Sequence, residues 1–281
     1  MKIIKDIIQM QEISNRLRAE GKTIGFVPTM GYLHEGHLSL MRLTRDKCQV
    51  LVASIFVNPT QFGPNEDLDQ YPRDFQKDEE LCREENVDII FYPDTDSMYP
   101  KPYHTFVNVN ELSETMCGLS RPTHFKGVTT IVSKLFNIVK PNIAVFGQKD
   151  YQQLTIIKQI VKDLNYDIQI LTGPTIRESD GLALSSRNKY LDNVERNKAR
   201  ALYQSLQLAE NLVNKGELSS KKIKSEMQNL ITRKGDMTID YIEIADGDTL
   251  ETLDEIKDNT LIALAVRIGK TRLIDNIVIY L

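Results

Sequence analysis

The feature that most constrains this fold is a regular alternation of strand-like and helical segments through the first 175 residues. Apolar, β-branched runs predict strands at 23–29, 49–57, 87–92, 142–147 and 166–171. Amphipathic patterns predict helices at 36–47, 74–85, 124–139 and 150–163. Because alternating strands and helices form a mainly parallel sheet with helices on both faces, we predict an α/β fold with a Rossmann-like, doubly wound parallel sheet.

The pattern changes after about residue 175. Two helical patterns come first, and three strand-like runs follow them, at 194–213, 220–232, 238–244, 261–266 and 273–280. This order predicts a smaller C-terminal α+β domain. We therefore expect a Rossmann-like domain over 1–175 and a lid domain over 176–281, packed closely because no low-complexity linker separates them.

Composition narrows the classes of protein to consider. A formal net charge of -4 argues against a broadly basic surface for nucleic acid. The three cysteines are far apart and odd in number, which favours reduced thiols in the cytoplasm over a disulfide framework. The N-terminal segment carries charges every few residues, so it predicts a first helix rather than a signal peptide. No apolar run approaches the roughly 18 residues of a membrane span.

The segment VPTMGYLHEGH at 27–37 ends a predicted strand and opens a predicted helix. A helix start offers backbone N–H donors and partial positive charge, which attract phosphate oxygens. His34 and His37 can add imidazole donors on one side, and Gly36 lets the backbone approach a nucleotide closely. Two other interpretations stay open: half of a metal site, or a purely structural pair. His104 and His124 are the remaining histidines.

Two more polar turns are candidates for binding phosphate, the first at the same edge of the sheet and the second where the C-terminal domain begins. Gly147, Gln148, Lys149 and Asp150 follow the strand NIAVF, where Lys149 can contact phosphate and Asp150 can accept from a ribose hydroxyl or simply cap the next helix. The polar turn that follows GLAL can bracket phosphate oxygens with two hydroxyls and a guanidinium, or form an ordinary serine-rich loop. Its residues are Ser185, Ser186 and Arg187.

Two glutamines are candidates for holding a small polar acid. Gln61 lies in the loop 58–68 after the second strand, and Gln153 lies one turn into the helix after Asp150. An amide both donates and accepts, which suits hydroxyls and a carboxylate, although exposure to solvent is an equally good explanation of either residue. The segment RPTHFKGV at 121–128 is expected to add positive charge nearby, or to be a solvated helix entrance.

With these motifs in place, the chain resembles the pantoate-β-alanine ligase family over nearly its whole length. The segments that carry the resemblance occur in the family's order and are PTMGYLHEGH at 28–37, FVNPTQF at 56–62, YPRD at 71–74, RPTHFKGV at 121–128, FGQKDYQQL at 146–154 and LSSRN at 184–188. Two positions depart from the family pattern. Leu184 replaces a frequent methionine, and Lys77 stands where some relatives have an acidic residue, which leaves Asp78 as the nearby acidic candidate for Mg²⁺ and no ligand assigned.

The resemblance implies ATP-dependent condensation of (R)-pantoate with β-alanine to pantothenate, AMP and diphosphate, through a pantoyl-adenylate intermediate. It also implies Mg²⁺ beside ATP and a homodimer. The alternative is a nucleotidyltransferase that adenylates a small phosphorylated acceptor. Neutral Gln61 and Gln153 favour the ligase, because a phosphate acceptor would call for extra cations.

The resemblance also implies roles for individual residues. Pantoate contacts fall on Gln61 and Gln153, with Gln61 also beside β-alanine, and His37 takes the position of proton donor. The implied catalytic residues are His34, His37, Lys149, Ser186 and Arg187. The implied ATP-binding residues are Met30, Gly31, Tyr32, Leu33, His34, Glu35, Gly36, His37, Gly147, Gln148, Lys149, Asp150, Ile176, Leu184, Ser185, Ser186 and Arg187.

Overall fold

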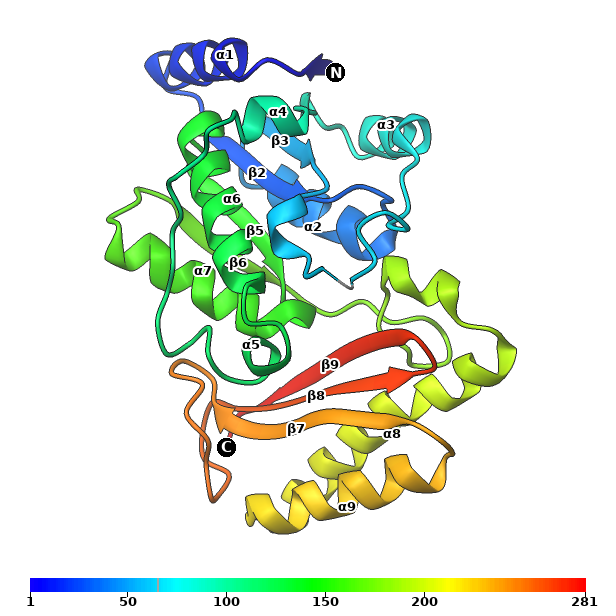
Figure 1. Cartoon of the computed structure of the whole chain (residues 1–281). Helices are drawn as coiled ribbons and strands as arrows, with labels where there is room; N and C mark the ends of the chain where they lie inside the picture. The colour runs from blue at the N-terminus through cyan, green and yellow to red at the C-terminus, as the bar shows by residue number, and fades with distance from the viewer. Residues whose placement is uncertain (65) are drawn as a thin grey trace.

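The computed structural model describes residues 1–64 and 66–281, so Asn65, in the predicted loop 58–68, lies outside the described residues. A six-stranded parallel sheet fills the first part of the chain (Figure 1). Its strands are β1 (Lys2–Ile4), β2 (Ile24–Thr29), β3 (Val50–Ile55), β4 (Ile89–Phe91), β5 (Ile143–Gly147) and β6 (Gln169–Gly173). The predicted parallel sheet is therefore confirmed.

The strand order β1-β4-β3-β2-β5-β6 makes the sheet doubly wound. From β2 the chain builds outward through β3 and β4, and it then returns to add β5 and β6 on the other side of β2. In open parallel sheets, ligands bind at such a switch in direction, beyond the carboxyl ends of the strands. Here that position lies after Thr29 of β2 and Gly147 of β5.

Helices cover both faces of this sheet (Figure 1). Those of the first part are α1 (Ile7–Ala19), α2 (Glu35–Arg45), α3 (Phe75–Glu84), α4 (Thr95–Met98), α5 (Cys117–Ser120), α6 (His124–Val139) and α7 (Tyr151–Asp163). One core joins the sheet to α1, α6 and α7 around the fully buried Phe26 and Phe136. A second core joins the opposite face to α2 and α3 around Met41 and Cys82. Burying both faces explains why the central strands are almost continuously apolar.

Two predictions in this part were wrong in detail. The N-terminal segment does not begin as a helix, because Lys2 to Ile4 pair in parallel with β4 and the Asp6 carboxylate caps α1, accepting from the Gln9 N–H. The last predicted strand, 166–171, lies at Gln169–Gly173 instead, in register with β5. In both places the pairing partner, which is distant in sequence, sets the boundary.

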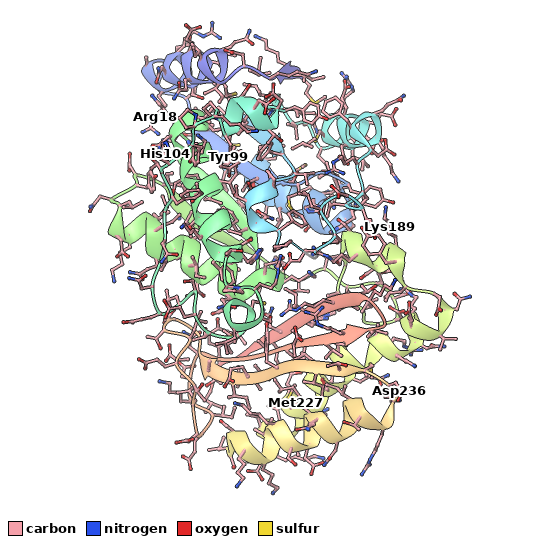
Figure 2. All side chains as sticks on the ribbon, viewed as in Figure 1. Arg18, Tyr99, His104, Lys189, Met227 and Asp236 are labelled. Carbon is pink, nitrogen blue, oxygen red and sulfur yellow. The ribbon has the colours of Figure 1, made fainter. Side chains whose placement is uncertain are left out.

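The C-terminal part contains an antiparallel sheet in the order β7-β8-β9, with two helices beneath it in Figure 1. Its elements are α8 (Asn193–Asn214), α9 (Ser220–Arg233), β7 (Thr238–Asp246), β8 (Thr260–Ile268) and β9 (Thr271–Ile279). The predicted α+β composition is confirmed, and Figure 2 shows the fully buried Met227 between α9 and the sheet. In the described part of the chain, every helix is too short or too polar to cross a membrane.

Candidate active site

A cavity of about 890 Å³ lies between the two sheets, at the carboxyl ends of β2 and β5. Most of the predicted site residues line it, although their segments are far apart in sequence. The lining includes Met30, His34, Gly36, His37, Gln61, Gly147, Lys149, Asp150, Gln153, Ile176, Leu184, Ser185, Ser186 and Arg187. Five predicted residues lie outside the lining: Gly31, Tyr32, Leu33, Glu35 and Gln148.

The turn between β2 and α2 is held from within the protein. Gly31 and Tyr32 both have positive φ, and the buried Asp78 of α3 accepts from the Tyr32 and Leu33 N–H groups at 2.8 and 2.7 Å. The Gly31 N–H donates to the Thr29 hydroxyl at 3.1 Å. These N–H groups therefore have protein partners, contrary to the expectation that they are open to phosphate.

His34 and His37 form a capping box at the start of α2. His34 Nδ1 accepts from the Gly36 N–H at 3.2 Å, and His37 Nδ1 accepts from the His34 N–H at 3.3 Å. The two rings lie against each other, tilted by 36° with their centroids 4.1 Å apart. Because each Nδ1 accepts, each neutral ring carries its proton on Nε2. The pair is therefore structural and also offers two N–H donors of fixed identity.

Both imidazoles are neutral near pH 7. Burial, reinforced by Lys149, lowers the pKa of His34 to about 4. Burial, with His34 and Lys149 beside it, also lowers the pKa of His37 well below its ordinary value. In the free protein these rings therefore act as hydrogen-bond donors rather than as cations.

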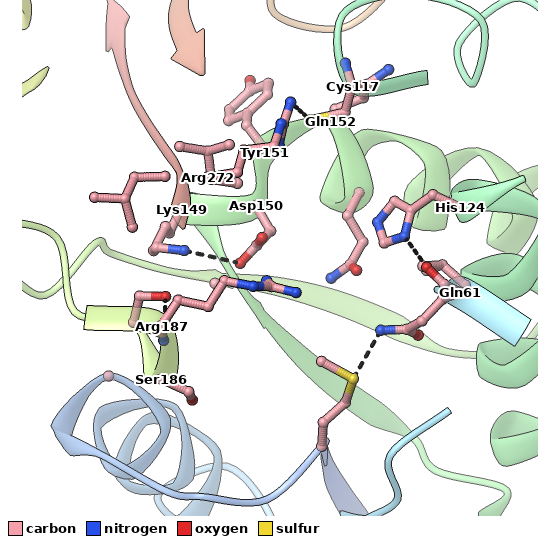
Figure 3. Close-up of a pocket in the computed structure, with 18 of the residues that line it drawn as sticks. Gln61, Cys117, His124, Lys149, Asp150, Tyr151, Gln152, Ser186, Arg187 and Arg272 are labelled. Atoms are coloured by element: carbon pink, nitrogen blue, oxygen red, sulfur yellow. Dashed lines mark hydrogen bonds and ion pairs between the residues drawn. The ribbon is translucent and has the colours of Figure 1, made fainter. Parts of the chain in front are cut away.

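The short 3-10 helix η2 (Gln148–Asp150) continues β5 and opens α7. Lys149 Nζ lies 4.0 Å from Asp150 Oδ2, an ion pair that is marked in Figure 3. Asp150 occupies the N-cap position of α7, but its side chain makes no capping hydrogen bond. Capping therefore does not occupy the Asp150 carboxylate, which faces the cavity beside the Lys149 ammonium.

The loop that carries Ser185 to Arg187 forms the 3-10 helix η3 (Ser186–Tyr190). The Ser185 hydroxyl caps η3 by accepting from the Arg187 N–H at 3.3 Å, and the buried Ser186 hydroxyl donates to the Tyr32 carbonyl at 3.4 Å. The Arg187 guanidinium makes two hydrogen bonds to Asp67, at 3.0 and 2.8 Å. Burial opposes ionisation of Asp67, but Arg187 outweighs it and holds the pKa of this carboxyl below its usual range.

Gln61 ends the short 3-10 helix η1 (Pro59–Gln61) and is held through both its backbone and its side chain. Its carbonyl accepts from Arg121 Nη2 at 3.2 Å and from His124 Nδ1 at 2.9 Å. Its side-chain oxygen accepts from Asn58 Nδ2 at 3.1 Å, so Nε2 turns toward Met30 Sδ, 2.9 Å away (Figure 3). Solvent exposure therefore does not describe Gln61, which presents an N–H donor at the cavity wall.

The expected positive charge around residues 121–128 is mostly cancelled. Arg121 pairs with Glu66 through two hydrogen bonds. Burial lowers the pKa of His124 to about 4, so this ring is neutral near pH 7. The Lys126 ammonium lies 4.6 Å from the centre of the Phe106 ring. Arg121 and His124 therefore add no net positive charge beside Gln61, contrary to the prediction, whereas Lys126 keeps its charge against an aromatic ring.

The chain was compared with the sequences and structures of known proteins. The sequence model of the family described as pantoate-beta-alanine ligase matches residues 2–278. The chain belongs to this family.

Relatives of this ligase family match along the whole chain. The pantothenate synthetases of Caldicellulosiruptor bescii and Thermotoga petrophila are both 54% identical over 279 residues, which is 99% of this chain and 99% and 100% of theirs. The solved pantothenate synthetase of Thermus thermophilus superposes with a TM-score of 0.95 at 39% identity, covering 100% of both chains. The Francisella tularensis pantoate-beta-alanine ligase, solved with beta-gamma ATP and beta-alanine, gives 0.83 at 38% identity, covering 99% and 97%.

Two polar residues of this ligase family member were missed by sequence reasoning. Asn58, only 1% exposed, donates from Nδ2 to the Gly127 carbonyl at 3.1 Å as well as to Gln61. Asp67 pairs with Arg187 across 120 positions of sequence. The signal for Asn58 was a polar residue close behind the apolar strand β3, whereas nothing local marks Asp67 as the partner of Arg187.

Proposed function

We propose that this chain catalyses the ATP-dependent condensation of (R)-pantoate with β-alanine, which yields pantothenate, AMP and diphosphate through a pantoyl-adenylate intermediate. Membership of the ligase family supports this activity over the full length of the chain. The observation that carries it is the composition of the cavity. Imidazole and ammonium donors suited to a triphosphate share one space with neutral glutamine amides suited to a small hydroxy acid.

ATP is assigned to the segments 30–37, 147–150, 176 and 184–187. The cavity-lining members would contact the nucleotide, whereas Gly31, Tyr32, Leu33, Glu35 and Gln148 would shape the backbone behind them. The lining supports this assignment because it combines hydrogen-bond donors with Lys149 at the switch point of a doubly wound sheet.

In the first step, a carboxylate oxygen of pantoate attacks the α-phosphorus of ATP. The bond from that phosphorus to the bridging oxygen breaks, and negative charge develops on the departing diphosphate. His34 and His37 would donate from Nε2 to this charge, together with the Lys149 ammonium. Ser186 and Arg187 would complete the set from the loop 185–187, which touches the histidine turn through the Ser186 hydroxyl. Catalysis would then rest on positioning and on fixed donors rather than on covalent participation of the protein.

His37 would begin the cycle as a neutral donor, because its pKa lies well below the ordinary value through burial in the free protein. A bound triphosphate places several negative charges beside the ring, which raises the pKa of an imidazole. The proton-donor role implied by the family resemblance therefore depends on the nucleotide itself. The Nδ1 hydrogen bond from the His34 N–H keeps the donating nitrogen on the cavity side throughout.

In the second step, the amine of β-alanine attacks the carbonyl carbon of the mixed anhydride. A C–N bond forms, the bond from that carbon to the phosphate oxygen breaks, AMP leaves, and the amine loses a proton. Gln61 and Gln153 would hold the pantoyl hydroxyls and carbonyl during the attack. Gln61 is suited to this role because its amide oxygen is already taken by Asn58, which leaves the N–H groups for substrate oxygens.

Mg²⁺ is proposed to arrive with ATP rather than to occupy a site built by the protein. In the described residues, no group of three or more His, Cys, Asp or Glu side chains is arranged to hold a metal ion. Asp78, the acidic candidate from the sequence, uses both carboxylate oxygens on backbone N–H groups. When bound to the phosphates, Mg²⁺ would screen their charge.

The nucleotidyltransferase alternative is disfavoured by the charges around Gln61. A phosphorylated acceptor requires cations at its phosphate, but Arg121 is paired with Glu66 and His124 is neutral. A carboxylic acid with hydroxyls makes a smaller electrostatic demand, which the two glutamine amides meet.

Three further features are proposed on the family resemblance and the sequence pattern: a homodimer, a cytoplasmic location, and a lid domain over 176–281. The lining of the cavity supports the lid, because Ser186, Arg187 and residues of β8 and β9 face the first sheet across it. Size-exclusion chromatography with light scattering would test the dimer, since a single peak at the monomer mass would contradict it.

The activity is tested by supplying ATP, Mg²⁺, pantoate and β-alanine and by measuring AMP and pantothenate. We expect AMP formation that requires both acids, and pantothenate in equal amount. Diphosphate formed with pantoate alone, only up to the enzyme concentration, would identify the adenylation step. Transfer of AMP to a phosphorylated acceptor, without pantothenate, would overturn the ligase assignment.

A further inference from the structure

Two neighbouring residues of β9 contact both walls of the proposed nucleotide site. Asp275 and Asn276 are each only 3% exposed. Successive residues of a strand point to opposite faces of the sheet, so one strand can present these side chains in two directions. The contacts of the two residues bear this out, because Asp275 reaches the hairpin that carries Ile176 and Leu184, and Asn276 reaches the turn that carries Lys149.

The first wall is the hairpin 176–184 beyond β6. Its backbone is closed by the Leu184 N–H to the Ile176 carbonyl at 3.0 Å, by the Glu178 carbonyl and N–H bonding to Gly181 and Leu182, and by an isolated bridge from Arg177 to Ala183. The Arg177 guanidinium donates to both oxygens of Asp275, at 2.5 and 2.9 Å, and to the Gly181 carbonyl at 3.2 Å. This buried pair fixes the hairpin against β9.

The second wall is the turn at Gln148 and Lys149. One side-chain nitrogen of β9, Asn276 Nδ2, donates to the Gln148 carbonyl at 3.0 Å and to the Lys149 carbonyl at 2.9 Å. An NH₂ group has two hydrogens, so it can serve both carbonyls at once. The contact joins segments 127 and 128 positions apart in sequence and sets the backbone from which the Lys149 side chain extends.

The first sheet does not set the spacing of these walls by itself. Pairing between β5 and β6 ends at Gly147 and Gly173, before either wall begins. Beyond that point the two segments leave the sheet, and β9 lies against both. Beyond the end of the β5–β6 pairing, the side chains of β9 therefore link the hairpin 176–184 to the turn at Lys149.

We propose that Asn276 is a positioning residue for ATP, and that the pair Asp275 and Asn276 sets the width of the nucleotide site. This inference rests on the proposed function, because it takes the segments 147–150 and 176–187 as the nucleotide walls.

The test compares Asn276→Ala with Asn276→Ser and with a control that weakens the same sheet elsewhere. Thr260→Val is the control, since the buried Thr260 hydroxyl bonds to Lys257 and lies outside the cavity lining. We expect Asn276→Ala to weaken ATP binding, measured by calorimetry without pantoate, by about tenfold, and Asn276→Ser to fall between it and the wild type. The KM for pantoate should stay within about twofold, and Thr260→Val should lower the unfolding midpoint without changing ATP affinity.

Wild-type ATP affinity in both Asn276 variants would overturn the inference and leave the contact as ordinary packing. An equal loss of ATP affinity in Thr260→Val would do the same, because it would trace the effect to general weakening of the sheet. If Asn276→Ala does not fold, Asn276→Ser carries the comparison with Thr260→Val. A wild-type chain that binds ATP but forms no AMP with both acids would overturn the proposed function, while the binding comparison would still test Asn276.

Discussion

The turn 30–37 and the loop around Arg187, which would both contact the phosphates, are held in place in different ways. The turn 30–37 is fixed by short-range backbone contacts and by the buried Asp78, and its histidines cap their own helix. The loop around Arg187 lies against the same cavity, but an ion pair with Asp67 holds its guanidinium, and both side chains stay partly exposed, at 29% and 23%. The turn 30–37 is therefore formed before a ligand arrives, whereas the position of the Arg187 guanidinium depends on its ion pair with Asp67, which a phosphate can replace.

This difference shows how a site can combine rigidity with access. Donors that stabilise developing charge are most effective when they need no rearrangement during the reaction. Partly exposed ion pairs contribute little to stability, so a phosphate oxygen can replace Asp67 at the Arg187 guanidinium at small cost. We therefore expect substitutions in the histidine turn to have the largest effect on the rate, and substitutions at the Arg187 pair to have smaller effects on the rate and on ATP binding.

The largest effect is expected at His37. His37→Ala removes the Nε2 donor and should slow adenylate formation by about 10²- to 10³-fold, the cost of losing one donor to developing charge. The measurement is single-turnover formation of pantoyl adenylate. Loss of the capping box should lower the free energy of unfolding by only about 1 kcal/mol.

His37→Gln is the matched variant, because glutamine at this position can restore the capping box without an imidazole. It should recover the unfolding free energy but not the rate. A variant that recovers both would show that capping, rather than the imidazole, is what the reaction needs from His37.

The second prediction concerns acid stability. The unfolded chain protonates His34 near pH 6.5, whereas the folded chain does so only near pH 4, so stability should fall as the pH drops through this window. The loss is at most on the order of 3 kcal/mol for this residue. Urea unfolding at neutral and at acidic pH measures it.

His34→Asn should reduce this acid-induced loss, because asparagine keeps an N-cap acceptor and does not titrate. His104→Asn is the control, because His104 is exposed and lies outside the cavity lining. An equal fall in stability for wild type and His34→Asn would show that other titrating groups, such as His37, His124 or the carboxylates, control the acid transition.

The third prediction separates the shape of Arg187 from its charge. Arg187→Lys keeps the positive charge but loses the planar fork, so adenylation should slow by about tenfold, the value of one hydrogen bond to a charged group. Steady-state rates at saturating ATP measure the effect. A wild-type rate would indicate that Arg187 serves only to hold the loop.

The smallest effect is expected for Asp67→Asn, which frees the guanidinium before ATP arrives. Since partly exposed pairs are worth about 0.2–1 kcal/mol, ATP should bind a few-fold more tightly at low salt. Calorimetry at two salt concentrations measures the change, with Glu66→Gln as the neighbouring control. Weaker ATP binding in Asp67→Asn would show that the pair holds Arg187 in its binding position instead of competing with the nucleotide.

Prediction from sequence succeeded wherever a segment carries its own pattern. The helix at His124–Val139 was predicted at its observed bounds, because its apolar periodicity starts and stops sharply. The clustering of His34, Lys149 and Gln61 was also predicted, because the carboxyl ends of parallel strands meet at one edge. The roles of these residues stay predictions until they are measured.

Prediction failed where the partner lies far along the chain. The strand at Lys2–Ile4 forms because it pairs with β4. The charges of Arg121 and Arg187 are balanced by Glu66 and Asp67, respectively. Local pattern carries no information about such pairs, which require the folded chain to bring them within hydrogen-bond distance.

The sequence by itself determined the doubly wound architecture and the α+β second part, because hydrophobic periodicity and turn chemistry are local properties. The resemblance to the ligase family pointed to most of the residues gathered at the cavity. Only the tertiary structure decided which nitrogen of His34 and His37 carries the proton and which side of the Gln61 amide faces the cavity. It also decided that β9 contacts both the hairpin 176–184 and the turn at Lys149. The orientation of the Gln61 amide and the distance between the hairpin 176–184 and the turn at Lys149 are set by contacts between distant segments. Such contacts cannot be predicted from local sequence patterns.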